Sequence, residues 1–233
     1  MEICLVWGIG FPFLGTVLGA ALVWAVSRES GRLRRIVAGG SAGVMGWASV
    51  WSLLVPGLRM SSGALAGFVL GIGFLWLTAR LLGAGGNRGA LVALAVVLHN
   101  IPEGMATGVS FGSFLTGSGV ELGQALSVGL GIGLQNVPDG AMVSIPLRQR
   151  GMGRGKAFGL GLLSAFVEPV AAGLMLVWAR ELTFLLPGLM GFAAGAMVFV
   201  MATELIPSME VHRGRAEGLL AAGAGIALMG AVL

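Results

Sequence analysis

Cysteine and charged side chains are scarce in this sequence of 233 residues. Cys4 is the single cysteine, so an intrachain disulfide is excluded. Charged residues make up 10% of the chain, whereas an average soluble domain contains about 25%. Histidine is also scarce, with only His99 and His212. The low charge excludes a soluble globular domain of this length.

Apolar residues and glycine fill the sequence instead. Hydrophobic residues make up 56% of the chain, and the mean hydropathy is +0.94. Glycine accounts for 42 residues, well above the usual ~7%, and small residues let membrane helices approach closely. The isoelectric point near 11.0 does not indicate nucleic-acid binding, because the basic residues form no single patch. This composition is typical of a membrane protein with tightly packed helices.

About eight apolar segments approach the ~20 residues that a helix needs to cross a bilayer. They are Ile3–Val26, Ile36–Leu58, Gly63–Leu82, Ala90–Gly112, Gly123–Leu147, Ala157–Ala179, Thr183–Ile206 and Ala216–Leu233. No basic region precedes the first segment, so we interpret it as a retained span rather than a cleaved signal peptide. The segments predict an all-α protein that spans the lipid bilayer repeatedly, as a single transmembrane transporter domain over residues 1–233.

The basic residues predict how these spans are oriented. Twelve of the 14 lysines and arginines fall in every second connection, and the alternate connections hold only Arg59 and Arg180. The twelve are Arg28, Arg32, Arg34, Arg35, Arg80, Arg88, Arg148, Arg150, Arg154, Lys156, Arg213 and Arg215. Positively charged loops stay in the cytoplasm, so we expect both termini to face outward from a plasma (inner) membrane.

A weak internal repeat relates the second and seventh segments at a constant offset of 152 residues. The aligned pairs are Gly43 with Gly195, Met45 with Met197, Ser52 with Glu204, Leu53 with Leu205 and Leu54 with Ile206. An odd number of spans separates the copies, so they would cross the membrane in opposite directions. Inverted repeats are typical of transporters with a substrate site near the midplane. Chance similarity between Gly- and Leu-rich helices is the alternative.

Two similar heptapeptides lie inside apolar segments, and each combines polar residues with a proline and a glycine. They are Leu98-His99-Asn100-Ile101-Pro102-Glu103-Gly104 and Leu134-Gln135-Asn136-Val137-Pro138-Asp139-Gly140. Residues four apart share a face of a helix, so His99 lies over Glu103. Gln135 lies over Asp139 for the same reason. Each proline lacks an N–H and clashes with the preceding turn, which predicts a kink. Two such helices facing each other would form a cation site.

Apart from Arg80 and Glu217, which lie within three residues of a span end, the predicted spans contain four carboxylates and no lysine or arginine. They are Glu103, Asp139, Glu168 and Glu204. A charge at the bilayer centre costs roughly 2.5–3.5 kcal/mol on insertion scales, so these groups need a neutralising partner. His99 is the only side chain away from the span ends that can carry a positive charge. Protonation and a bound metal ion are the other options.

Each of these residues also has a structural interpretation. A buried histidine is more often a packing residue than a ligand, but the glutamate one turn from His99 favours a ligand. Glu168 precedes Pro169 at midspan, and a structural kink would need only the proline. Glu204 lies at the cytoplasmic end of its span, where contact with headgroups or a place on the exit path is favoured over ligation.

Several further residues are interpreted first as packing residues, because small and polar side chains are common between membrane helices. They are Met45, Ser52, Thr107, Ser110, Met105, Met142, Met175 and Met197. For Met45 and Ser52, a place along a transport pathway is the alternative.

The polar motifs resemble those of a known membrane transporter family. His99–Gly104 is similar to the fourth-span signature of the ZIP (Zrt/Irt-like) divalent metal transporters. Gln135–Gly140 resembles their fifth-span signature, and Glu168-Pro169 and Gly195–Pro207 are similar to further family patterns. The resemblance covers nearly the whole chain in span number, orientation and motif order, and it is to a prokaryotic-type member.

The resemblance implies eight transmembrane helices, with an inverted three-plus-three repeat around helices 4 and 5. It implies uptake of Zn²⁺ or a related ion into the cytoplasm, and it suggests a homodimer. From the inverted repeat we expect alternating access, in which the repeats move around the two motif helices and open one side at a time. The resemblance also implies a binuclear metal site, with one ion near His99, Glu103, Gln135 and Asp139 and a neighbour near Asn100, Asn136 and Glu168. Asn136 offers an amide where other members can offer a carboxylate, so whether one or two ions bind stays open.

The ligand types suit borderline divalent ions. One imidazole with carboxylate and amide oxygens is suited to Zn²⁺, Fe²⁺, Mn²⁺ or Cd²⁺, whereas the lack of cysteine ligands argues against Cu(I). We choose Zn²⁺ as the transported substrate and expect no organic cofactor. Two alternatives remain, a transporter of protons or other ions and an intramembrane zinc enzyme. The enzyme is disfavoured because zinc proteases usually carry two histidines four residues apart.

Overall fold

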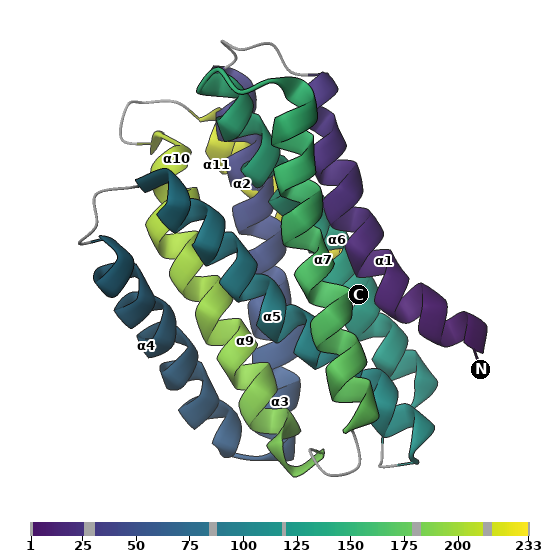
Figure 1. Ribbon diagram of the computed structural model, residues 1–233. Coiled ribbons are helices and arrows are strands. Elements are labelled where there is room, and N and C mark those ends of the chain that lie inside the picture. Colours follow the sequence, from purple (N-terminus) through teal and green to yellow (C-terminus); the bar gives the residue numbers. More distant parts are fainter. Residues whose placement is uncertain are drawn as a thin grey trace.

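The structure is a computed structural model that describes residues 2–25, 31–83, 88–117, 120–178, 183–211 and 216–232. Within these residues every regular element is a helix, as the sequence predicts (Figure 1). The first are α1 (Glu2–Ala21), η1 (Leu22–Trp24), α2 (Gly31–Trp47), η2 (Ala48–Leu54), α3 (Val55–Met60), α4 (Gly63–Gly83) and α5 (Arg88–Leu115). The others are α6 (Leu122–Gln149), α7 (Arg154–Val177), η3 (Thr183–Leu185), α9 (Leu186–Val200), η4 (Met201–Leu205), α10 (Ile206–Ser208) and α11 (Glu217–Val232).

Several of these helices are suited to a bilayer. In the described part of the chain, four helical stretches are long and apolar enough to cross a membrane: Gly31–Met60, Gly63–Leu81, Arg154–Val177 and Leu186–Ser208. Gly8–Trp24 and Glu217–Ala231 are shorter apolar helices. α5 and α6 contain 28 residues each, about 42 Å of helix. They carry most of the buried polar groups described below.

The outer face of α4 is apolar and uncovered. Leu65 and Val69 are four residues apart and so lie one above the other on the helix, as do Leu77 and Leu81, and all four are exposed. A soluble protein rarely exposes an apolar stripe of this length, whereas lipid tails solvate it without penalty. The fold is therefore that of an all-α membrane protein.

Two π-helical segments interrupt the second and seventh predicted spans. η2 separates α2 from α3, and η4 separates α9 from α10. Each is followed within two residues by a proline, Pro56 or Pro207. A proline lacks an N–H and crowds the carbonyl one turn earlier, which favours a locally widened helix. The two segments lie at positions related by the offset of 152.

Helix pairs approach closely where glycine on one helix faces a carbonyl on the other. A methyl group on any of these glycines would overlap that carbonyl oxygen. The glycine–carbonyl pairs are Gly39–Gly218 and Gly43–Ala222 between α2 and α11, and Gly191–Ala64 and Gly195–Phe68 between α9 and α4. The corresponding pairs elsewhere are Gly104–Glu168 and Gly108–Ala172 between α5 and α7, and Gly140–Thr16 between α6 and α1.

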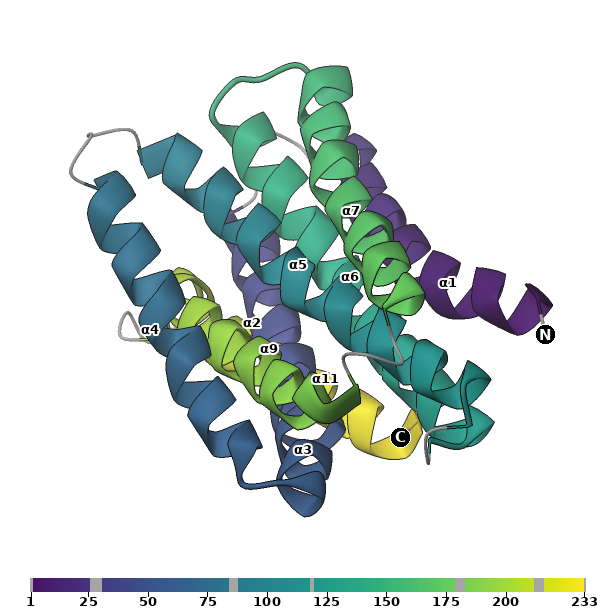
Figure 2. The ribbon, with the colours of Figure 1, turned by 60° about the horizontal axis from the view of Figure 1, so that its bottom comes forward.

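These close contacts join the helices in four pairs, α1 with α6, α5 with α7, α4 with α9 and α2 with α11. α1, α5, α6 and α7 also contact one another and form one bundle, and we group α2, α4, α9 and α11 as the other (Figures 1 and 2). The interface between the bundles is apolar, because Ala106, Ile132, Met45 and Met197 belong to one buried cluster. We call these the motif bundle, which carries both heptapeptides, and the scaffold bundle.

One end of the scaffold bundle is held by ion pairs. Arg34 lies 2.9 Å and Arg35 lies 3.3 Å from the carboxylate of Glu210. Arg35 also lies 3.5 Å from Glu217, and its side chain is only 7% exposed. A buried guanidinium needs such partners, because an unpaired buried charge is strongly destabilising. The pairs therefore join α2 to α11 and to the segment that follows α10.

Candidate metal site

Polar side chains that have almost no contact with solvent meet inside the motif bundle. They are Glu103 on α5, Gln135 and Asn136 on α6, and Glu168 on α7, each 0–1% exposed, together with Asp139 on α6, 4% exposed. Both α5 and α6 run through their motif without a break, so the prolines do not end either helix. The kink predicted at each proline stays a prediction.

Two hydrogen bonds tie these residues across three helices. Gln135 Nε2 donates to Glu103 Oε1 at 2.6 Å, and Asn136 Nδ2 donates to Glu168 Oε2 at 2.6 Å. Successive residues of a helix point about 100° apart. Gln135 therefore reaches α5 while its neighbour Asn136 reaches α7. α6 is the central helix of the site, because its two adjacent amides each hold one buried carboxylate.

Two asparagines also fix the backbones around the site. Asn100 Nδ2 donates to the backbone oxygen of Ser164 at 2.9 Å, and Asn136 Nδ2 donates to that of Pro12 at 3.1 Å. The sequence predicts Asn100 and Asn136 as oxygen ligands of a second ion. In the structure their amide nitrogens donate to backbone oxygens instead. Asn100 thereby links α5 to α7, and Asn136 links α6 to α1.

Four buried oxygens in the site have no hydrogen-bond partner within the described residues. They are Glu103 Oε2, Gln135 Oε1, Asn136 Oδ1 and Glu168 Oε1. Leaving one buried polar group unsatisfied costs roughly 1–3 kcal/mol, and more when the group is charged. Glu103, Asp139 and Glu168 are also all buried, so a negative charge on any of them would lack the solvation of water. Both features favour a cation at this position.

The described side chains alone do not complete a metal-binding cluster. Among them, no three histidine, cysteine, aspartate or glutamate side chains are grouped as metal ligands would be. The reason is local, because the amides hold Glu103 and Glu168 on separate sides of α6. His99 belongs to α5, but its side chain lies outside the described part of the structure, so its predicted role stays a prediction.

Methionine packs against the site from the scaffold bundle. The Met197 sulfur lies 3.9 Å from Gln135 Nε2, which is within the range of a weak hydrogen bond. From the sequence, Met197 is predicted only as a packing residue. The repeat was the signal that could have singled it out, since the offset of 152 pairs it with Met45. Both residues are 1% exposed.

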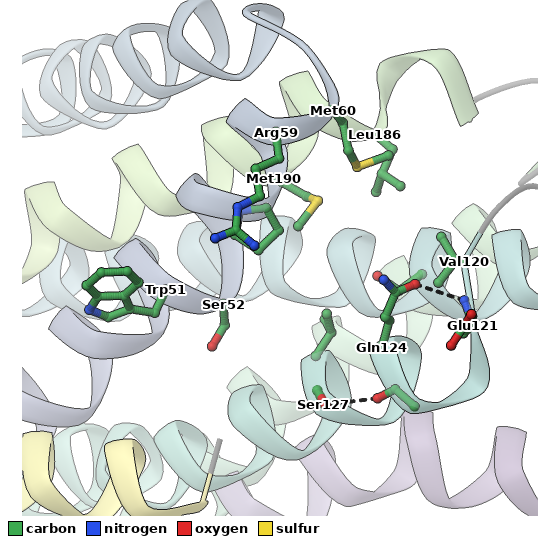
Figure 3. Close-up of a pocket in the computed structure, with 14 residues that line it drawn as sticks. Trp51, Ser52, Arg59, Met60, Val120, Glu121, Gln124, Ser127, Leu186 and Met190 are labelled. Atoms are coloured by element: carbon green, nitrogen blue, oxygen red, sulfur yellow. Dashed lines mark hydrogen bonds between the residues drawn. The ribbon is translucent and has the colours of Figure 1, made fainter.

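A pocket of about 640 Å³ opens between the bundles near the start of α6. Figure 3 shows Ser52 and Arg59 of η2 and α3 on one side of it and Gln124 and Ser127 of α6 on the other. We call it the Ser52 pocket. Ser110 also lines it, seven residues beyond Glu103 on α5. The predicted pathway residue Ser52 therefore faces a cavity, whereas Met45 is buried in the core.

A smaller pocket of about 170 Å³ lies at the other end of α6. Glu204, Arg34, Arg150 and Ser208 are among the residues that line it, and we call it the Glu204 pocket. Glu204 is partly buried there. α6 thus leads from the Ser52 pocket to the Glu204 pocket, and the buried polar residues lie between them.

The comparisons with known proteins agree with these features. The family model described as ZIP Zinc transporter matches residues 80–233. Zinc transporter GufA of Myxococcus xanthus is 36% identical over 226 residues, which cover 87% of this chain and 86% of that protein. Zinc transporter ZIPB of Bordetella bronchiseptica is 33% identical over 244 residues, covering 93% and 76%. The chain therefore belongs to the ZIP family of zinc transporters.

Proposed function

We propose that this protein carries Zn²⁺ across the membrane into the cytoplasm. The observation that supports this most strongly is the set of buried carboxylates and amides whose oxygens lack partners within the described residues. Burying a charge in hydrocarbon is unfavourable, and a divalent ion would offset the negative charge of Glu103, Asp139 and Glu168. The named relatives are zinc transporters, which supports zinc as the ion.

The proposed ligands are the residues that the motifs single out. They are His99, Asn100, Glu103, Gln135, Asn136, Asp139 and Glu168. An amide that donates through its nitrogen also carries an oxygen acceptor. Rotation of the Gln135 or Asn136 amide would place its oxygen where its nitrogen now lies. Each amide can therefore hold a carboxylate when no ion is bound and offer oxygen when one arrives.

We further propose eight membrane spans with an inverted repeat, in which the first three spans match the last three. The supporting contacts come in pairs. Pro12 and Ser164, whose backbone oxygens accept hydrogen bonds from the two asparagines, are 152 residues apart. Thr16 and Glu168 are also 152 residues apart, and the carbonyl of each faces a glycine. Gly39 and Gly43 of α2 relate to Gly191 and Gly195 of α9 by the same offset. The two halves therefore pack alike.

The same relation links the two pockets, which supports alternating access. Ser52 of one pocket corresponds to Glu204 of the other, and Met190 corresponds to Ala38. A carrier with equivalent halves can open each side in turn around a fixed site. Movement of the motif bundle against the scaffold bundle would enlarge one pocket at the expense of the other. The apolar interface between the bundles permits such sliding.

The direction of transport rests on the distribution of basic residues, which predicts cytoplasmic connections before α2, α5, α7 and α11. Single cysteines placed in a Cys4→Ser background test it. Gly155→Cys, in the first turn of α7, should react with an impermeant thiol reagent only after the membrane is opened. Ser62→Cys, directly before α4, should react in intact cells. Both positions are exposed. The reverse pattern would contradict the topology and the proposed direction.

Other functions are less well supported. ZIP family members are transporters and not enzymes, which sets the zinc enzyme aside. Fe²⁺, Mn²⁺ and Cd²⁺ suit the same oxygen and nitrogen donors and stay as alternative substrates. A homodimer stays a prediction from the family resemblance.

Purified protein in liposomes tests the function itself. Vesicles loaded with a zinc-sensitive dye should accumulate Zn²⁺ faster than protein-free vesicles, and the rate should saturate with Zn²⁺ concentration. Pyranine-loaded vesicles without metal separate this from the proton-transport alternative. A metal-independent proton flux with no Zn²⁺ accumulation would favour a proton transporter and contradict the proposal.

A further inference from the structure

A polar residue of α1 lies in the motif bundle, and the ligand set proposed above does not include it. Thr16 is 1% exposed, and its hydroxyl oxygen has no hydrogen-bond partner within the described residues. A buried hydroxyl without a partner is unfavourable, so such groups usually mark a bound water, an ion or a functional role.

The hydroxyl of Thr16 differs from those of the other helical threonines whose side chains are described. A threonine inside a helix ordinarily donates to the carbonyl four residues earlier. Three helical threonines do so, Thr78 to Phe74, Thr107 to Glu103 and Thr203 to Phe199, and Thr116 does the same to Gly112 directly after α5, all at 2.8–3.0 Å. For Thr16 that carbonyl belongs to Pro12, and it accepts a hydrogen bond from Asn136 Nδ2 instead.

The surroundings of Thr16 place it beside the site. Pro12 and Thr16 are four residues apart, so they share one face of α1. The Asn136 amide that contacts Pro12 also holds the carboxylate of Glu168. The carbonyl of Thr16 lies against Gly140, the residue after Asp139. Thr16 thus belongs to the turn of α1 that packs on the motif of α6.

Thr16 also corresponds to Glu168 in position. The two are 152 residues apart, and the carbonyl of each faces the last glycine of a motif, Gly140 or Gly104. On α7 this position carries a carboxylate directed to Asn136. On α1 it carries a neutral hydroxyl. One half of the site is therefore charged at this position and the other is not.

We propose that the Thr16 hydroxyl is a further oxygen donor of the metal site, binding the transported ion directly or through one water molecule. This inference rests on the proposed function. A hydroxyl adds a donor without adding charge, so it would complete the coordination on the α1 side. The negative charge then stays on the carboxylates of the other three helices.

Zinc binding to the purified protein by isothermal titration calorimetry tests this role. Thr16→Val keeps the branched shape and removes the hydroxyl, and it should weaken Zn²⁺ binding about tenfold, as loss of a supporting metal contact does. Thr16→Ser keeps the hydroxyl and should bind within about twofold of the parent protein, the reproducibility expected of the measurement. Thermal unfolding without metal should show no loss of stability in Thr16→Val, because the hydroxyl it removes has no partner.

Thr78→Val is the control, since it removes a hydroxyl on α4, in the scaffold bundle, that already donates to the carbonyl of Phe74. It should leave zinc affinity unchanged. Thr16→Val with the parent affinity would overturn the inference, as would an equal loss in Thr16→Ser, which would point to side-chain shape. Thr16→Ala provides the same comparison if Thr16→Val does not fold. If the parent protein itself binds no zinc, the proposed function fails rather than this inference alone.

Discussion

Replacing Glu103 with glutamine is expected to abolish zinc uptake and to weaken zinc binding more than about 100-fold, because loss of even an outer-shell partner costs 10- to 100-fold. Glu103→Gln keeps the side-chain length, and its amide oxygen can still accept the hydrogen bond from Gln135. It removes one of the three charges that the proposed ion would neutralise. Uptake into liposomes and calorimetric binding measure the two effects.

The Glu103→Gln variant should lose metal binding without losing stability. Without metal, the free energy of unfolding of Glu103→Gln should not fall, because a neutral amide replaces a buried carboxylate. Glu217→Gln makes the same chemical change at a carboxylate that is 32% exposed and pairs with Arg35 within the scaffold bundle, so uptake should be unchanged. Normal zinc affinity in Glu103→Gln would show that Glu103 is not a ligand.

Gly104→Ala is expected to destabilise the protein by about 1–3 kcal/mol and to reduce transport strongly, because inserted atoms force packed helices apart. A methyl group at Gly104 would overlap the backbone oxygen of Glu168, and nothing flexible lies there to yield. Separating α5 from α7 would also lengthen the hydrogen bond from Asn100 to Ser164. Thermal unfolding in detergent and zinc uptake measure the two losses.

Gly173→Ala provides the comparison on the partner helix. Beyond the backbone of its own helix and its chain neighbours, no described atom lies within 4 Å of a methyl group built at Gly173, so the variant should keep both stability and uptake. Alanine even favours a helix over glycine by up to about 1 kcal/mol. Equal behaviour of Gly104→Ala and Gly173→Ala would mean that the close approach of α5 and α7 is not required.

Local sequence patterns predict the helices and part of the site. The apolar segments predict the positions of the helices, because the length of an apolar run can be read from neighbouring residues alone. The motifs foretell that Glu103 and Gln135 are inside the protein, and both are fully buried. A carboxylate in an apolar run is conspicuous, since its burial is costly without a partner. The high glycine content alone also predicts that the helices pack closely.

Contacts between distant helices are what the sequence does not reveal. Asn136 donates to both Pro12 and Glu168, which are 124 and 32 residues away. Those partners depend on which helices pack against each other at their glycines, and no local sequence pattern specifies that pairing. Thr16 shows the same limit. The sequence does not predict that Asn136 bonds the carbonyl of Pro12, nor that the Thr16 hydroxyl lacks a partner within the described residues. Met197 likewise meets Gln135 only through the docking of the two bundles.

The position of the bound ion tests the central claim most directly. Crystals grown with Zn²⁺, with diffraction recorded above and below the zinc absorption edge, would locate the metal independently of transport. The predicted result is an anomalous peak inside the motif bundle, among Glu103, Gln135, Asn136 and Glu168. A peak confined to the Glu204 pocket, or no peak within coordination distance of Glu103 and Glu168, would contradict the proposed metal site.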